Sequence, residues 1–205
     1  MSTDQTALRF LALGDSYTIG EAVDPEMRWP VQLANLLGKR GHARIEPQII
    51  ARTGWTTDEL RSAIRDESPR GPYQLVSLLI GVNNQYRGRD SEEYRKEFSE
   101  LLGMAIRFAG DDPRRVIVLS IPDWGVTPFA EGRSREEIAE QIDRFNTINR
   151  EVTLSRRAHY VEVTTISRKA ATDASLLASD GLHPSGAMYR RWAELALPAA
   201  MSALR

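Results

Sequence analysis

The sequence of 205 residues has no cysteine and only three histidines, and these shortages exclude several kinds of chemistry. Without cysteine the chain forms no disulfide, carries no thiol nucleophile and offers no thiolate to a metal. With only His42, His159 and His183 available, a metal cluster would need carboxylates for most of its ligands, and no HExxH or comparable spacing occurs. We therefore expect no metal site.

The sequence also lacks an excess of charge of one sign and any long apolar run. Lys and Arg number 27 against 28 Asp and Glu, so the formal net charge is −1. This balance predicts no broad attraction to nucleic acid or to an anionic membrane. No window is long enough to span a bilayer, and residues 1–10 lack the basic start and apolar core of a signal peptide. We expect a cytoplasmic protein without stable membrane insertion, although a leader removed beforehand would leave secretion open. The oligomeric state is not predicted.

Five apolar runs rich in Val, Ile and Leu predict β-strands, at residues 9–14, 44–51, 73–81, 114–122 and 158–163. The first, third and fourth runs are almost continuously apolar, which is typical of strands covered on both faces. Segments with helical spacing lie between them, at residues 27–40, 57–65, 91–109 and 134–155, and a last helix is expected from near Pro184 toward the C-terminus. Pro198 inside that helix predicts a kink or a break.

Strands that alternate with helices indicate right-handed crossovers and a mostly parallel sheet between two helical layers. The predicted fold is therefore a three-layer α/β/α sandwich, flavodoxin-like, with five strands in a single domain over residues 1–205. Ligands bind beyond the carboxyl ends of the strands in such folds, so the residues that follow each run are the candidate site.

The residues at those strand ends are Ser16 in "GDSYTIG", Gly54 and Trp55 in "RTGWTT", Asn83 and Asn84 in "GVNNQY", and Trp124 in "PDWGVTPF". Near the C-terminus, outside the predicted strands, "SDGLHPSG" adds Asp180 and His183. Taken singly, each has an ordinary explanation as a turn, a helix cap or a surface residue. Taken together, they supply the parts of an acyl-transfer site.

The chemistry of acyl transfer explains why these residue types belong together. Serine is a weak nucleophile that needs a base, and histidine suits that role because its pKa lies near neutrality. Asp180, three residues before His183, can hold the ring in one tautomer from a single irregular turn. Donors for the developing oxyanion would be the N–H groups of Ser16 and Gly54 and the side-chain amide of Asn83.

At this level the sequence resembles the SGNH or GDSL-type hydrolase family. "GDSYTIG" is similar to the family's first block, Gly54 and Asn83 match the glycine and asparagine of the second and third blocks, and "DGLH" is similar to the last block. The resemblance implies Ser16, Asp180 and His183 as the catalytic triad and Ser16, Gly54 and Asn83 as the oxyanion hole. One departure is visible, because the third block commonly reads Gly-x-Asn-Asp and this chain has Asn84 at its last position. That departure concerns the geometry of the loop more than the catalysis.

The resemblance implies a serine esterase or acylhydrolase that acts on small ester substrates without metal or cofactor. Short-chain or acetyl esters, including those of carbohydrates, are the first expectation, and a thioesterase or lysophospholipase is the alternative within the family. The proposed substrate contacts are Trp55, Asn84, Tyr86 and Trp124; Trp29 and Tyr17 are placed near the same loops, whereas Trp192 is assigned to the core.

Two further alternatives stay open. The chain could be a non-catalytic ligand-binding module of flavodoxin-like shape, but such a module predicts a GxGxxG or P-loop after the first strand, and neither occurs. Residues 122–134, "PDWGVTPFAEGRS", could form a movable lid over the site or a packed surface loop.

Overall fold

A computed structural model describes residues 8–42 and 45–205 and contains one five-stranded sheet. Its strands are β1 (Leu8–Gly14), β2 (Ile45–Ala51), β3 (Leu75–Leu79), β4 (Val116–Leu119) and β5 (His159–Val161). They pair in the order β2-β1-β3-β4-β5, and every pairing is parallel. All five predicted strands are confirmed, and the order is that of flavodoxin-like folds. Arg44, the first residue of the second predicted run, lies outside the described residues.

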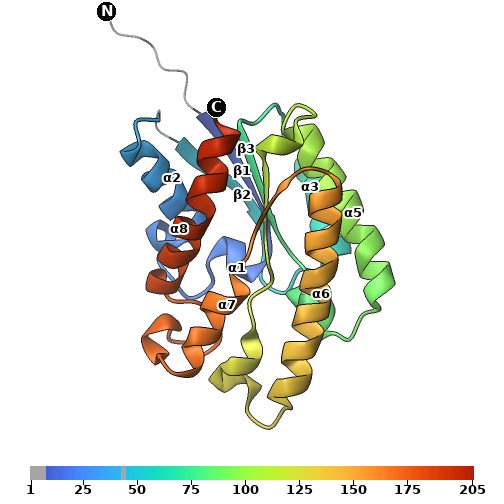
Figure 1. The fold of residues 1–205 in the computed structure, drawn as a ribbon, viewed down its shortest axis with the longest axis vertical. Coiled ribbons are helices and arrows are strands. Elements are labelled where there is room, and N and C mark those ends of the chain that lie inside the picture. The colour runs from blue at the N-terminus through green and yellow to red at the C-terminus, as the bar shows by residue number, and fades with distance from the viewer. Residues whose placement is uncertain (1–7, 43–44) are drawn as a thin grey trace, which may run out of the picture.

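Helices cover both faces of the sheet, as Figure 1 shows. Helices α2 (Trp29–Lys39) and α8 (Gly186–Ala203) pack together on one face. Helices α3 (Thr57–Glu67), α5 (Ser91–Phe108) and α6 (Arg135–Ser155) form the layer on the other face. The α/β/α sandwich predicted from the sequence is therefore the observed architecture.

Three short helices follow strands directly and were not predicted: α1 (Ser16–Ile19), α4 (Val82–Tyr86) and α7 (Thr164–Ser167). They are too short to show a helical period in the sequence. The remaining short turns of 3-10 helix are η1 (Pro25–Met27), η2 (Pro113–Arg115), η3 (Trp124–Val126), η4 (Pro128–Ala130), η5 (Arg168–Ala171) and η6 (Ala174–Leu176).

The sequence predicts a kink or a break at Pro198, and the break is wrong because α8 is one helix from Gly186 to Ala203. Buried residues lie on both sides of the proline, Trp192 before it and Ala200 after it, and this face of α8 packs against α2. A proline inside a helix costs about 3 kcal/mol. Burial of several apolar side chains offsets that cost, since each contributes about 1.5–3 kcal/mol when it is large.

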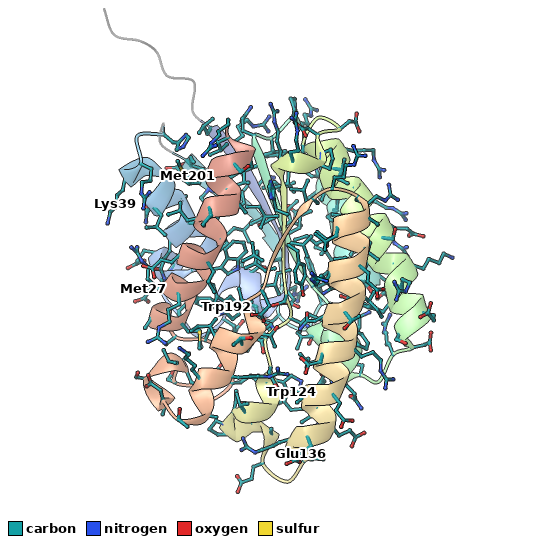
Figure 2. The ribbon with its side chains drawn as sticks, in the orientation of Figure 1. Met27, Lys39, Trp124, Glu136, Trp192 and Met201 are labelled. Atoms are coloured by element: carbon teal, nitrogen blue, oxygen red, sulfur yellow. The ribbon has the colours of Figure 1, made fainter. Side chains whose placement is uncertain are left out.

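Three of the four tryptophans, Trp29, Trp124 and Trp192, are buried, and Trp55 is half-buried. Trp192 is fully buried, as predicted, and Figure 2 labels it on α8. Trp29 is also fully buried as the first residue of α2, and its ring lies 6.5 Å from that of Phe10. It therefore belongs to the core and is not among the residues that line the cavity described below. Trp124 follows β4, near the N-terminal end of α6 (Figure 2).

Candidate active site

A cavity of about 150 Å³ lies beyond the carboxyl ends of the central strands. Ser16, Gly54, Asn83 and His183 all line it, although they are far apart in the sequence. Ser16, Gly54 and Asn83 follow β1, β2 and β3, whose carboxyl ends meet at one edge of the sheet, and His183 reaches that edge from the loop before α8. The structure thus gathers members of four separate sequence motifs around one space.

The turn from β1 into α1 explains the residues before Ser16. A Cβ atom on Gly14 would lie 2.2 Å from Thr18 Oγ1 and 2.6 Å from the carbonyl oxygen of Leu79, so only glycine fits. Asp15 caps α1, because its carboxylate accepts a hydrogen bond of 3.0 Å from the N–H of Tyr17. Ser16, the first residue of α1, is 4% exposed and faces the cavity.

Asp15 is an unusual carboxyl group because it is completely buried beside the candidate nucleophile. Burial disfavours the charged form and raises the pKa of Asp15 to about 7, while the hydrogen bond from Tyr17 acts in the opposite direction. Within the described part of the chain, its second carboxylate oxygen has no hydrogen-bond partner. This group therefore changes its charge near neutral pH.

Asp180 and His183 project from one irregular turn, as their spacing predicts. A carboxylate oxygen of Asp180 lies 2.6 Å from His183 Nδ1, and the other accepts the N–H groups of Leu182 and His183 at 3.0 and 2.9 Å. Partial burial opposes ionisation of Asp180, but these hydrogen bonds outweigh it and lower the pKa of the carboxyl group. Because Nδ1 is engaged by Asp180, Nε2 is the ring nitrogen of His183 that is left for another partner, and His183 lines the cavity.

Two backbone hydrogen bonds hold the ends of that turn together. The N–H of Ala178 donates to the carbonyl of His183 at 2.7 Å, and the N–H of Ser185 donates to the carbonyl of Leu176 at 2.9 Å. His183 is 6% exposed, and the ring of Tyr17 packs against it with the ring centres 5.4 Å apart. The imidazole is thus fixed from two sides.

Ser16 and His183 line the same cavity, but no hydrogen bond joins their side chains among the described residues. Nucleophile and base often stand at longer separations in ligand-free sites and close on binding substrate. The shared cavity therefore keeps the pair compatible with nucleophilic catalysis.

The loop after β2 and helix α4 form the opposite side of the cavity. Gly54 has φ of 86°, a left-handed conformation that favours glycine, and a Cβ atom there would meet only Arg87 Nη2, at 3.8 Å. Asn83 Nδ2 donates to the carbonyl of Trp55 at 2.9 Å. Since the amide has two N–H groups, its second one remains for a ligand.

Two of the predicted substrate contacts do not reach the cavity. Asn84 is fully buried, accepting from the N–H of Thr57 at 3.1 Å and donating to its hydroxyl at 2.6 Å, so the prediction for Asn84 is wrong. The side chain of Trp55 is half-buried and is not among those that line the cavity; only its carbonyl contributes, through Asn83. Both residues support the loop instead.

The predicted contacts Tyr86 and Trp124 do line the cavity, and Phe129 completes an aromatic wall with them. The three ring centres lie 5.4 to 6.2 Å from one another. The Arg133 guanidinium lies 4.8 Å from the centre of the Tyr86 ring, and the Trp124 indole N–H donates to Gln85 Oε1 at 2.8 Å. Phe129 was not singled out from the sequence, although it lies in residues 122–134, the segment considered as a lid.

Residues 122–134 are tied to the body of the protein at their start. Asp123 is buried and accepts a hydrogen bond of 2.9 Å from Arg168, and Trp124 is also buried. Phe129, farther along, is 46% exposed at the mouth of the cavity. The segment lies at the entrance of the cavity, as the lid hypothesis requires. The contacts that hold its first residues favour the packed surface loop instead. Movement of the segment stays a prediction.

The described residues contain no group of three or more His, Asp or Glu that could hold a metal ion. They also contain no helix long and apolar enough to cross a membrane.

The sequence profile of the GDSL-like lipase/acylhydrolase family matches residues 12–191. The match covers most of the chain and includes every motif that lines the cavity, so the protein belongs to this family of ester hydrolases. No curated protein matches the chain in sequence.

Solved structures of low sequence identity share the fold. TesA is 19% identical, with 96% of this chain and 99% of TesA covered and a TM-score of 0.70. The psychrotrophic esterase EstA from Pseudoalteromonas sp., inhibited by monoethylphosphonate, is 14% identical, with 94% and 96% covered and a TM-score of 0.67. A mutant acetyl-xylooligosaccharide esterase from Geobacillus Stearmophilus is 17% identical, with 94% of both chains covered and a TM-score of 0.70.

Proposed function

We propose that this protein is a serine esterase that cleaves short-chain carboxylic esters through an acyl-enzyme on Ser16. The observation that carries the proposal is the Asp180 to His183 contact of 2.6 Å at a cavity that Ser16 also lines. A carboxylate, an imidazole and a serine hydroxyl in this order form a nucleophilic triad. Asp180 and His183 are therefore assigned as orienter and base.

The first half of the reaction forms the acyl-enzyme. Ser16 Oγ attacks the ester carbon while its proton passes to His183 Nε2, and the carbonyl oxygen becomes an oxyanion. The N–H groups of Ser16 and Gly54 and the Asn83 amide stabilise that charge. Collapse breaks the bond to the leaving oxygen, which takes the proton from His183 and departs as the alcohol.

The second half regenerates the enzyme by hydrolysis. Water gives a proton to His183 and adds to the acyl carbon, and the same three donors stabilise the second oxyanion. The bond to Ser16 Oγ then breaks, His183 returns the proton to it, and the carboxylic acid leaves. No step requires a metal or a cofactor.

The size of the cavity favours a short acyl group. A cavity of about 150 Å³ holds a molecule of the size of benzene, or about six carbon atoms. The aromatic wall of Tyr86, Trp124 and Phe129 would also suit a sugar ring in the alcohol part of the ester. The similar acetyl-xylooligosaccharide esterase makes acetylated carbohydrates a reasonable first substrate to test.

A second candidate is a thioesterase or lysophospholipase activity on longer acyl chains. The observation in its favour is that Tyr86 and Phe129 are 41% and 46% exposed, so the apolar wall extends outward from the cavity. A longer chain could lie along these rings. The two candidates differ in the chain length at which kcat/KM is greatest.

A series of p-nitrophenyl esters with acetyl, butyryl and octanoyl groups, together with acetylated xylo-oligosaccharides and acyl-thioesters, distinguishes these candidates. We expect the acetyl or butyryl ester to be hydrolysed best and Ser16→Ala to abolish hydrolysis. Ser62→Ala, which changes an exposed serine on α3, is the matched control and keeps wild-type activity. Wild-type activity in Ser16→Ala would overturn the proposal, and no activity in the wild type would favour a ligand-binding module.

A further inference from the structure

A chain of hydrogen bonds runs from α4 through the start of α3 to α5, directly behind the proposed oxyanion hole. Its members are Asn84, Thr57 and Glu97. Asn84 and Thr57 are fully buried, and the side chain of Glu97 is 12% exposed. Asn84 is also the position at which this sequence departs from the third block of the family it resembles.

The chemistry of the groups fixes the direction of every bond in the chain. The N–H of Thr57 can only donate, so the Asn84 atom that it contacts at 3.1 Å is the carbonyl oxygen. The other end of the amide is then the NH2 group, which can only donate and lies 2.6 Å from Thr57 Oγ1. The single hydroxyl proton of Thr57 is left for the Glu97 carboxylate, to which it donates. Each donor therefore has one acceptor.

This chain of hydrogen bonds connects the two segments that carry the proposed oxyanion donors Gly54 and Asn83. Thr57 begins α3, three residues after Gly54, and Asn84 follows Asn83 in α4. Two more hydrogen bonds run in parallel, from Asn83 Nδ2 to the Trp55 carbonyl at 2.9 Å and from Arg87 Nη2 to the Gly54 carbonyl at 2.7 Å. The spacing between the Gly54 N–H and the Asn83 amide depends on these links.

We propose that Glu97 is a positioning residue for the oxyanion hole, which acts through Thr57 and requires an amide at position 84. The inference rests on the proposed function. An aspartate at position 84 would place a second carboxylate against the Thr57 hydroxyl, whose one proton already goes to Glu97. Two acceptors would then share one donor, and the unsatisfied buried oxygen would push α4 away from α3.

A cycle of four proteins tests this dependence: the wild type, Asn84→Asp, Glu97→Gln and the double variant. We expect kcat to fall about 10- to 100-fold in Asn84→Asp with little change in KM, because a displaced oxyanion donor acts in the transition state. Glu97→Gln alone stays within about twofold, since its amide oxygen still accepts the Thr57 proton. In the double variant the amide introduced at position 97 can donate to Thr57. The Thr57 hydroxyl then turns to the carboxylate introduced at position 84, so kcat recovers about tenfold or more.

The pH profile gives a readout that a general loss of stability would not produce. Lower pH supplies a proton to one of the two carboxylates in Asn84→Asp and restores the missing donor. The ratio of kcat in Asn84→Asp to kcat in the wild type should therefore rise as pH falls. Taking the ratio cancels the titration of the proposed base, which both proteins share.

Matched controls are Asn35→Asp, at an exposed position of α2, and Glu100→Gln, which changes the other carboxylate beside Arg61 and leaves the chain intact. Neither control substitution should change kcat, and neither should alter the effect on kcat of the substitutions at positions 84 and 97. If Asn84→Asp does not fold, recovery of a folded, active double variant still supports the proposal. Wild-type kcat in Asn84→Asp, or a double variant no better than Asn84→Asp, would overturn it. A wild type that hydrolyses no ester would overturn the proposed function, and this inference with it.

Discussion

Two parts of the cavity wall, which we call the hydrogen-bonded side and the aromatic side, meet at α4 and are held in different ways. On one side, Gly54, Asn83, Asn84 and Arg87 belong to segments joined by directed hydrogen bonds between α4 and the loop before α3. On the other side, Tyr86, Trp124 and Phe129 meet mainly through ring contacts, and the indole of Trp124 makes one side-chain hydrogen bond. The hydrogen bonds that hold the first side depend strongly on direction, whereas the ring contacts that hold the second side depend on it much less.

This difference matches the two tasks that an esterase site must perform. Donors stabilise an oxyanion only when they are aimed within a few tenths of an ångström, so their supports must be rigid. Contact between aromatic rings and an apolar or sugar group tolerates small shifts, since dispersion and burial have no strict direction. Changes on the hydrogen-bonded side should therefore affect kcat, and changes on the aromatic side should affect KM and chain-length preference.

The largest expected effect concerns the charge buried behind Ser16. The pKa of Asp15 is raised from 3.8 to about 7 by burial, so the folded protein binds a proton more tightly than the unfolded chain between these values. The free energy of unfolding should fall as pH rises through this range, by at most about 4 kcal/mol, and then level off above pH 7. Asn keeps an acceptor for the Tyr17 N–H and carries no charge, so Asp15→Asn should become more stable relative to the wild type as pH rises.

Urea unfolding at pH 5 and pH 8 measures this change, with Asp66→Asn on the exposed end of α3 as the control. The account would be contradicted if the free energies of unfolding of Asp15→Asn and the wild type differed by the same amount at both pH values. Asp180 acts in the opposite sense, because its pKa is lowered and its contribution to stability is lost as pH falls.

Removal of one proposed oxyanion donor should have the next largest effect. We expect Asn83→Ala to lower kcat by about 10²- to 10³-fold, or roughly 3–4 kcal/mol of barrier, with a much smaller change in KM. Steady-state hydrolysis of p-nitrophenyl acetate measures both constants, and Asn35→Ala on the exposed face of α2 provides the control. An increase in KM alone would assign Asn83 to substrate binding and would remove the contrast between the two sides.

The smallest expected effect is on the aromatic side. Phe129 is 46% exposed, so Phe129→Ala removes only part of its contact with a substrate. We expect KM for butyryl and octanoyl esters to rise about fivefold, or about 1 kcal/mol, while kcat changes little. Leu154→Ala, at a similarly exposed apolar residue of α6, is the control. A large fall in kcat would show that the aromatic wall also positions the reacting group.

Features set by local patterns were predictable from the sequence. The five apolar runs predicted all five strands. The nearly continuous first, third and fourth runs are β1, β3 and β4, the central strands of a sheet whose two faces are covered by helices. The spacing of Asp180 and His183 predicted their contact, which the structure confirms, because two side chains three residues apart can project from one turn. Two of the predicted helices, over residues 57–65 and 134–155, also begin with local hydrogen bonds: the N–H of Thr56 donates to Glu59 at 2.9 Å, and the N–H of Glu137 donates to Ser134 at 3.2 Å.

Features set by distant partners were not predictable. Asn84 and Asn83 look alike in the sequence, and only Thr57, 27 residues away, decides that Asn84 is buried. Trp29 and Trp124 both stand in or near loops, yet the first packs against Phe10 and the second faces the cavity. In these cases tertiary packing, which no short sequence window contains, decides the role of the residue.

The most direct test of the account is covalent labelling of the proposed nucleophile. The wild type, Ser16→Ala and Ser62→Ala are each treated with a fluorophosphonate, and the adducts are measured by intact mass and located by peptide mapping. The account predicts one adduct for each wild-type and Ser62→Ala chain, on Ser16, and none on Ser16→Ala. An adduct on another residue, or an unlabelled wild type, would contradict the central claim that Ser16 is the activated nucleophile.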